Sequence, residues 1–156
     1  MELNKKILLV GILFLILPNI SAVIINEIMY DAQGTDSGRE WIEIYNDGGD
    51  INLTGWKFYE GSTNHGLSLK QGDWMLNQGE YAIIADNDIN FLVDYPNFNG
   101  ILFDSSFSLL NTGETIILKN NSLDIIDPVN YDSNIGANGN GKSLQICSGS
   151  WKEKLP

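Results

Sequence analysis

Two neighbouring stretches decide the fold: residues 24–31 read IINEIMYD, and residues 40–46 read EWIEIYN. Each alternates branched apolar or aromatic side chains with polar ones, which is the period of a half-buried β-strand. The segment between them is rich in glycine, aspartate and serine, a composition that favours turns. The two stretches therefore predict a pair of neighbouring strands joined by a loop.

The same punctuation continues along the rest of the chain. Short runs of Ile, Val, Tyr, Phe and Trp are separated by turn-forming residues about every ten positions, and no long apolar stripe has helical spacing. This pattern predicts an all-β fold of two packed sheets. Pattern alone does not exclude a closed β-barrel, which is kept as the alternative. The predicted strands are residues 23–30, 40–46, 53–59, 80–85, 115–119, 123–131 and 143–147.

Two finer features follow from local chemistry. Asp86 or Asn87 can cap a short helix through Phe91 that ends at Tyr95-Pro96, and Phe91 is then expected to cover an open end of the sandwich. Trp56 shares a strand face with Phe58, so we place Trp56 between the two sheets.

The first 22 residues differ in character from everything after them. Lys5 and Lys6 precede an apolar run of 11 residues, 7–17, and Ser21-Ala22 offers small residues for cleavage. This order predicts a signal peptide, residues 1–22, because a membrane-spanning helix needs roughly 20 apolar residues. The alternative is an uncleaved membrane anchor. The rest of the chain, 23–156, has the length of a single domain that is secreted or held at the cell surface.

The charge and the cysteine content of residues 23–156 narrow the choice of partners. This part carries 7 basic and 19 acidic residues, a formal charge of −12, which repels phosphate backbones and argues against nucleic-acid binding. Cys147 is the single cysteine of the chain, so no intramolecular disulfide can form, and we expect Cys147 to be a small buried side chain. Stability must come from the core.

Several motifs together resemble the lamin tail domain family, in its prokaryotic exported form. The two opening stretches are followed by LTGW at 53–56, and the later matching segments are residues 76–85, 109–118, 126–131, 141–145 and Trp151. The resemblance implies an immunoglobulin-like β-sandwich, in a family whose exported members often stand beside nucleases or phosphoesterases. Family members usually continue past the tryptophan into a Pro-Thr-Pro-Gly-like tail, which is missing here. The interpretation of this chain as a fragment of a longer protein is therefore kept as an alternative.

We interpret the motifs that could suggest catalysis as structural features. Residues 136–143, GANGNGKS, match a phosphate-loop pattern, but the following residues predict a strand where such a loop needs a helix. His65 is the only histidine and lies among turn residues, so we expect an exposed loop side chain. Glu27 and Glu43 could pair on neighbouring strands for acid–base work, but no sugar-binding cleft is evident. We therefore interpret the chain as non-enzymatic.

Two sets of residues remain as candidate binding sites. Asp31, Asp36 and Glu40 could gather at one end of the sandwich as calcium ligands, with solvated acidic loops as the alternative, and no other cofactor is expected. Trp41, Glu43 and Tyr45 alternate onto one face and form a possible contact face.

These features favour a non-catalytic extracellular module for binding, adhesion or display. Its partner would be an unidentified protein or cell-envelope component, with membrane contact only through an uncleaved N-terminal segment. The alternatives are an accessory domain of an exported hydrolase whose catalytic part lies outside this chain, and a self-associating structural protein of the envelope.

Overall fold

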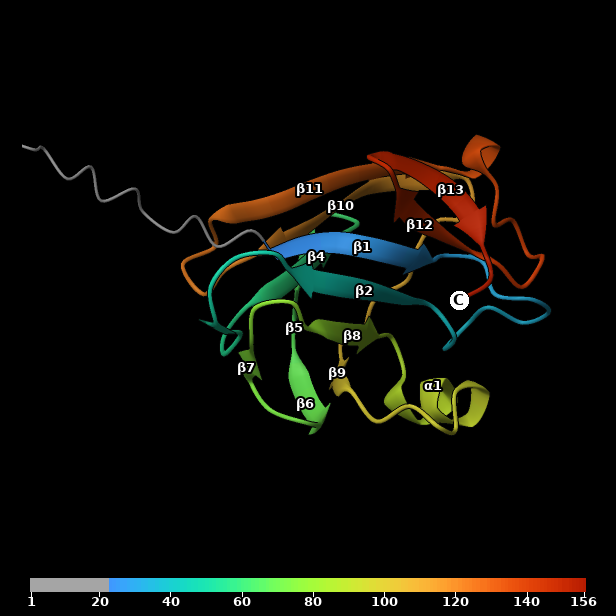
Figure 1. Ribbon diagram of the computed structural model, residues 1–156. Helices are drawn as coiled ribbons and strands as arrows, with labels where there is room; N and C mark the ends of the chain where they lie inside the picture. The colour runs from blue at the N-terminus through green and yellow to red at the C-terminus, as the bar shows by residue number, and fades with distance from the viewer. Residues whose placement is uncertain (1–22) are drawn as a thin grey trace, which may run out of the picture.

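The computed structural model describes residues 23–156, so the predicted signal segment and its cleavage point after Ala22 lie outside the described residues. The described chain folds into an all-β sandwich with one short α-helix (Figure 1). In chain order its elements are β1 (Val23–Met29), β2 (Trp41–Asn46), β3 (Ile51–Asn52), β4 (Lys57–Glu60), β5 (Thr63–Gly66), β6 (Ser68–Gln71), β7 (Met75–Leu76), β8 (Tyr81–Ala85), α1 (Asp88–Asp94), β9 (Ile101–Asp104), β10 (Gly113–Lys119), β11 (Ile125–Asp132), the 3₁₀ turn η1 (Ser133–Ile135), β12 (Ser143–Cys147) and β13 (Ser150–Lys154).

The strands form open sheets, which confirms the sandwich and not the barrel. The larger sheet has the order β13-β12-β1-β2-β8-β9-β6, the smaller β11-β10-β4-β5, and β3 pairs with β7 in a two-stranded ribbon. All strand pairs of the described chain are antiparallel except β8 with β9. Parallel neighbours need a crossover connection, and α1 lies in that connection.

The main core lies between the two large sheets. Ile25, Ile42 and Ile84 from the larger sheet pack with Phe58 and Leu118 from the smaller one, and all five are fully buried. Trp56 is 3% exposed and belongs to the same cluster, which confirms the sequence prediction for Trp56 and Phe58. Alternation along each strand therefore carries one set of side chains into a shared apolar layer.

A second, smaller core lies on the outer face of the larger sheet, beneath α1. Asn87 caps this helix through its Oδ1, which accepts from the N–H of Asn90 at 3.0 Å, and the chain leaves the helix at Tyr95. Phe91 packs there against Trp41 and Leu102. Figure 1 shows α1 beside β8 and β9, on a different side of the molecule from β10 and β11. The helix is as predicted, but Phe91 covers a sheet face, so its placement at an open end was wrong.

Six strands were not predicted from the sequence pattern because they are short or polar. β5 reads TNHG, β6 reads SLKQ and β13 reads SWKEK, so none has the apolar alternation that marks a strand. They are held by ladder bonds to stronger neighbours, as β13 is by β12 over five residue pairs. No helix within residues 23–156 is long and apolar enough to cross a membrane.

Candidate binding surface

The outer face of the larger sheet carries the predicted contact residues. Ile42 and Ile44 of β2 point into the main core, so Trp41, Glu43 and Tyr45 share the opposite face, as the sequence predicted. Trp41 is only 4% exposed, however, because it packs edge-on against Phe91, with 5.9 Å between ring centroids. Trp41 was therefore wrongly included in the predicted contact face, because α1 covers it. Glu43 and Tyr45 are partly exposed.

A β-bulge places two carboxylates side by side on this face. The pairing of β1 with β2 shifts between Ile25 and Glu27, so Asn26 is an extra residue and Glu27 pairs directly with Glu43. Asn26 Nδ2 donates to Glu43 Oε1 at 2.8 Å. Glu27 Oε1 accepts from Ser143 Oγ at 2.5 Å and from Gln145 Nε2 at 3.0 Å.

Burial sets the electrostatics of this carboxylate pair. It raises the pKa of Glu27, and the charge of Glu43 adds to that rise, while the hydrogen bonds from Ser143 and Gln145 oppose it. Burial also raises the pKa of Glu43, against the hydrogen bond from Asn26. The sequence placed these two glutamates on neighbouring strands, but their polar partners become visible only from the register. Hydrogen bonds from Asn26, Ser143 and Gln145 hold the pair in a local network.

Two tyrosines form the open part of the face, beyond the reach of α1. Tyr45 pairs with Tyr81 of β8, and their ring centroids lie 4.6 Å apart with the planes at 33°. Tyr81 is 49% exposed. We call Glu43, Tyr45 and Tyr81 the tyrosine strip. Sequence reasoning missed Tyr81, because only the register of β2 against β8 brings it beside Tyr45.

An open groove of about 470 Å³ begins at Tyr81. Glu80 and Asn99 offer it polar groups, and three glycines leave its backbone uncovered; the lining residues are Gly72, Gly79, Glu80, Tyr81, Asn99, Gly100 and Ile101. The surface therefore combines aromatic rings with carboxylate, amide and exposed backbone groups.

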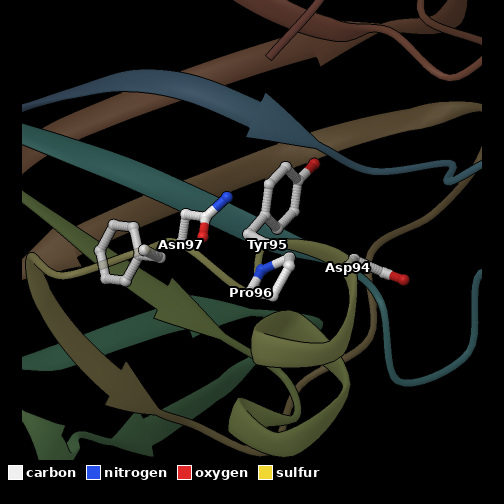
Figure 2. Close-up of a pocket in the computed structure, with 5 residues that line it drawn as sticks. Asp94, Tyr95, Pro96 and Asn97 are labelled. Atoms are coloured by element: carbon white, nitrogen blue, oxygen red, sulfur yellow. The ribbon is translucent and has the colours of Figure 1, made fainter.

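A second hollow of about 330 Å³ lies where the chain leaves α1 (Figure 2). Figure 2 shows Asp94, Tyr95, Pro96 and Asn97 following one another past the helix, with the Asp94 carboxylate and the Tyr95 ring extending in different directions. Asp94 Oδ1 pairs with Arg39 at 3.3 Å. Burial raises the pKa of Tyr95, the hydrogen bond from Trp41 opposes the rise, and the charge of Glu27 adds to it.

The glycine-rich loop before β12 is occupied by a carboxylate of the chain itself. Glu153 of β13 accepts from the N–H of Ala137 at 2.9 Å, from Asn140 Nδ2 at 2.9 Å and from Lys142 Nζ at 2.7 Å. These hydrogen bonds lower the pKa of Glu153 to about 2, and the bond from Ala137 contributes most. The strand predicted after the loop is present. Lys142, whose side chain is 38% exposed, forms a salt bridge with Glu153.

The predicted calcium ligands do not converge. Asp36 Oδ2 accepts from Asn111 Nδ2 at 2.8 Å, whereas the buried Glu40 accepts from the N–H of Leu109 at 2.8 Å. Asp31 has a pKa raised by burial and by the charge of Asp36. Across residues 23–156, no three His, Cys, Asp or Glu side chains are grouped to hold a metal ion.

Two single residues differ from their sequence expectation. His65 lies in β5, and its Nε2 is 2.9 Å from Glu60 Oε1, outside the geometry of a hydrogen bond. Its side chain is 16% exposed, so the exposed loop histidine was wrong. Cys147 is a free thiol at the end of β12 and is half-buried, so it is less enclosed than predicted.

Comparison with known families agrees with this architecture. Residues 18–133 match the family model described as the Lamin Tail Domain. No curated protein and no solved structure matches the chain. The family consists of non-enzymatic immunoglobulin-like domains, and the match covers most of the sandwich, from β1 to η1. The chain therefore belongs to the lamin tail domain family.

Proposed function

We propose that this chain is a non-catalytic module of the cell exterior, which binds a protein or another cell-envelope component through the tyrosine strip. The family is non-enzymatic, and the apolar N-terminal run followed by Ser21-Ala22 supports export. The carboxylate pair of Glu27 and Glu43 is engaged by amide and hydroxyl groups, which suits a structural role better than acid–base catalysis.

The observation that carries the proposal is the exposed ring of Tyr81 stacked on Tyr45. A tyrosine offers a large apolar ring and a hydroxyl while losing few rotamers on binding, so tyrosines are enriched in contact surfaces. Here the stacking fixes both rings before a partner arrives. The adjoining groove at Tyr81 adds polar groups that can orient the partner.

The negative charge of the domain limits the kinds of partner that it can bind. With 19 acidic and 7 basic residues in 23–156, the domain repels polyanions, and Glu43 and Glu80 place that charge at the strip and its groove. A neutral or basic surface complements it, and nucleic acid does not.

The edge strands weigh against self-association as the main role. β13 is an edge of the larger sheet, and it carries Lys152 and Lys154 as exposed side chains. Charged side chains, lysine above all, are a common device that keeps edge strands from pairing with another copy. A role as accessory domain of an exported hydrolase is compatible with the same strip, because the strip would then dock the enzyme to its target.

The test uses residues 23–156 mixed with an envelope fraction of the source cells and then sedimented. We expect the wild type to pellet and the double variant Tyr45→Ala/Tyr81→Ala to stay in solution. Tyr59→Ala is the matched control, because Tyr59 is a half-buried tyrosine on the outside of the smaller sheet, 3.8 Å from Lys119 Nζ. Equal pelleting of all three proteins would contradict the proposal.

Protease treatment of the fraction and enzymatic removal of its polysaccharide form two further arms. The arm that abolishes pelleting identifies the partner as protein or as polysaccharide.

A further inference from the structure

A polar row closes the end of the main core on the larger sheet. Ile42, Ile84 and Phe103 lie side by side across β2, β8 and β9, and all three are fully buried in that core. Moving two residues along each strand keeps the same face. The next row is therefore Glu40, Asp86 and Ser105, where a carboxylate, a carboxylate and a hydroxyl stand in place of three apolar side chains.

Backbone bonds confirm that these three positions adjoin one another. The N–H of Asp86 donates to the carbonyl of Glu40 at 3.0 Å, and the N–H of Ser105 donates to the carbonyl of Ala85 at 2.8 Å. Side chains directly opposite each other on neighbouring strands have Cβ atoms about 5 Å apart. Glu40 is 3% exposed and Ser105 is 1% exposed, so these two face the interior, while Asp86 is half-buried.

Oxygen atoms of this row lack partners. Within residues 23–156, Asp86 Oδ1 and Ser105 Oγ are buried without a hydrogen bond. Backbone groups supply the other contacts: Asp86 Oδ2 accepts from the N–H of Gly38, and Glu40 Oε2 accepts from the N–H of Leu109. In the same part of the chain, neither carboxylate is in a salt bridge. A buried carboxylate beside a half-buried one, without a counter-charge, is costly, so the row needs a cation or a proton.

We propose that Glu40, Asp86 and Ser105 bind a divalent cation of the calcium class at this end of the sandwich. Calcium takes six to eight oxygen ligands, and backbone carbonyls and waters commonly complete a set that carboxylates begin. The row offers oxygen donors only, which suits this ion and not zinc. Two carboxylates and a hydroxyl fall short of a group of three acidic, histidine or cysteine ligands, and no such group exists in residues 23–156. Water or backbone oxygens must therefore supply the rest.

Protons compete with the cation for the same oxygens. Burial raises the pKa of Glu40 to about 8 against the hydrogen bond from Leu109, and the charges of Asp86, Asp36 and Glu114 add to the rise. Burial likewise raises the pKa of Asp86 to about 6, with Asp104 and Asp36 adding to it and the hydrogen bonds of Gly38 and Glu40 opposing it. Both carboxyl groups therefore hold a proton more tightly than an ordinary carboxyl group does.

The experiment measures thermal unfolding of residues 23–156 at pH 8, with EDTA or with 10 mM Ca²⁺. For the affinities usual in extracellular calcium modules, we expect calcium to raise the Tm by roughly 5–10 °C. Asp86→Asn should abolish the rise, and Ser105→Ala should weaken calcium binding about tenfold or more. The control Asp47→Asn, at an exposed carboxylate, should behave as wild type.

Two results would overturn the proposal. A Tm of the wild type that is the same in EDTA and in 10 mM Ca²⁺ would show that the row holds a proton and no cation. A calcium shift that persists in both Asp86→Asn and Glu40→Gln would place the ion elsewhere. Neither result bears on the tyrosine strip, which lies on the opposite face of the sheet.

Discussion

Asp86 and Glu40 are joined by a backbone hydrogen bond of 3.0 Å just beyond the paired ends of β8 and β2, where the Asp86 N–H donates to the Glu40 carbonyl. Neither forms a salt bridge in residues 23–156. The pKa of Glu40 is raised to about 8 and that of Asp86 to about 6, mainly by burial. The stability of the domain must therefore depend on pH.

We predict that the domain, in EDTA, loses stability as the pH rises from about 5 to about 9. The folded pKa values exceed the ordinary values of 4.5 for Glu40 and 3.8 for Asp86, so folding favours the protonated forms. Their contribution is complete below about pH 4 and is lost as the pH rises through 6 and then 8. At about 1.4 kcal/mol for each tenfold change in proton affinity, the two pKa rises set an upper limit of roughly 8 kcal/mol on this loss, and solvent screening at the half-buried Asp86 reduces it.

Urea midpoints measured across this pH range check the prediction. Glu40→Gln should remove the step near pH 8 and make the variant more stable than wild type at pH 9. A midpoint that stays constant or rises between pH 5 and pH 9 would show that the two carboxyl groups are not desolvated as described.

Among the four tryptophans, we predict that Trp56→Ala destabilises the domain most, by roughly 3–5 kcal/mol. Trp56 fills the main core between the sheets, where the cavity cannot collapse. Trp41 is equally buried, but it lies beneath α1, which can settle onto the sheet when the ring is removed. Trp74 and Trp151 are only partly buried against the main core, so their loss should cost less.

Denaturant midpoints of the four Trp→Ala variants, followed by circular dichroism, rank these losses. If Trp41→Ala proves the costliest, the outer cluster under α1 contributes more to stability than the main core does at Trp56.

For the glycine-rich loop, we predict that Lys142→Ala changes the free energy of unfolding by about 0.5 kcal/mol or less, because its pair with Glu153 is largely solvated. Glu153→Ala should lower the Tm further, because it also removes the acceptor of the Ala137 and Asn140 bonds. Differential scanning calorimetry compares the two variants. Saturable ATP binding that Lys142→Ala abolishes would contradict this assignment.

For export, we predict cleavage after Ala22, which gives a product beginning Val23-Ile24-Ile25. Val23 is also the first residue of β1, so cleavage there leaves the first strand intact. The intact mass of the exported protein measures the cut. A product that keeps Met1 and stays with the membrane would instead show an anchor.

Much of the fold could be predicted from local sequence, because alternation is strong where a strand faces the core. Residues 40–46 show this, with Ile42 and Ile44 buried as their spacing requires. The polar strands β5, β6 and β13 could not be found, because their sequences lack apolar alternation. β5 and β13 are hairpin partners of β4 and β12, whereas β6 pairs with the more distant β9. Phe91 was assigned correctly to a helix but to the wrong surface, since its partner Trp41 is 50 positions earlier.

The candidate sites were less predictable, because they depend on register. Glu43 and Tyr45 could be assigned to one face, but Tyr81 joins them only through the pairing of β2 with β8. The calcium site predicted at Asp31, Asp36 and Glu40 was inferred from residues that are close in sequence. The sheet instead places Glu40 beside Asp86, 46 positions later in the chain.

The central claim is that the tyrosine strip is the contact surface of this domain, and one affinity ratio tests it most directly. The measurement is the Kd of residues 23–156 for the envelope fraction that binds them, by biolayer interferometry, for wild type, Tyr45→Ala/Tyr81→Ala and Tyr59→Ala. We predict at least a roughly tenfold weaker Kd for the double variant, because losing an aromatic anchor commonly costs more than 1 kcal/mol. Tyr59→Ala should bind within about twofold of wild type. A double variant that binds as tightly as wild type while remaining folded would contradict the claim.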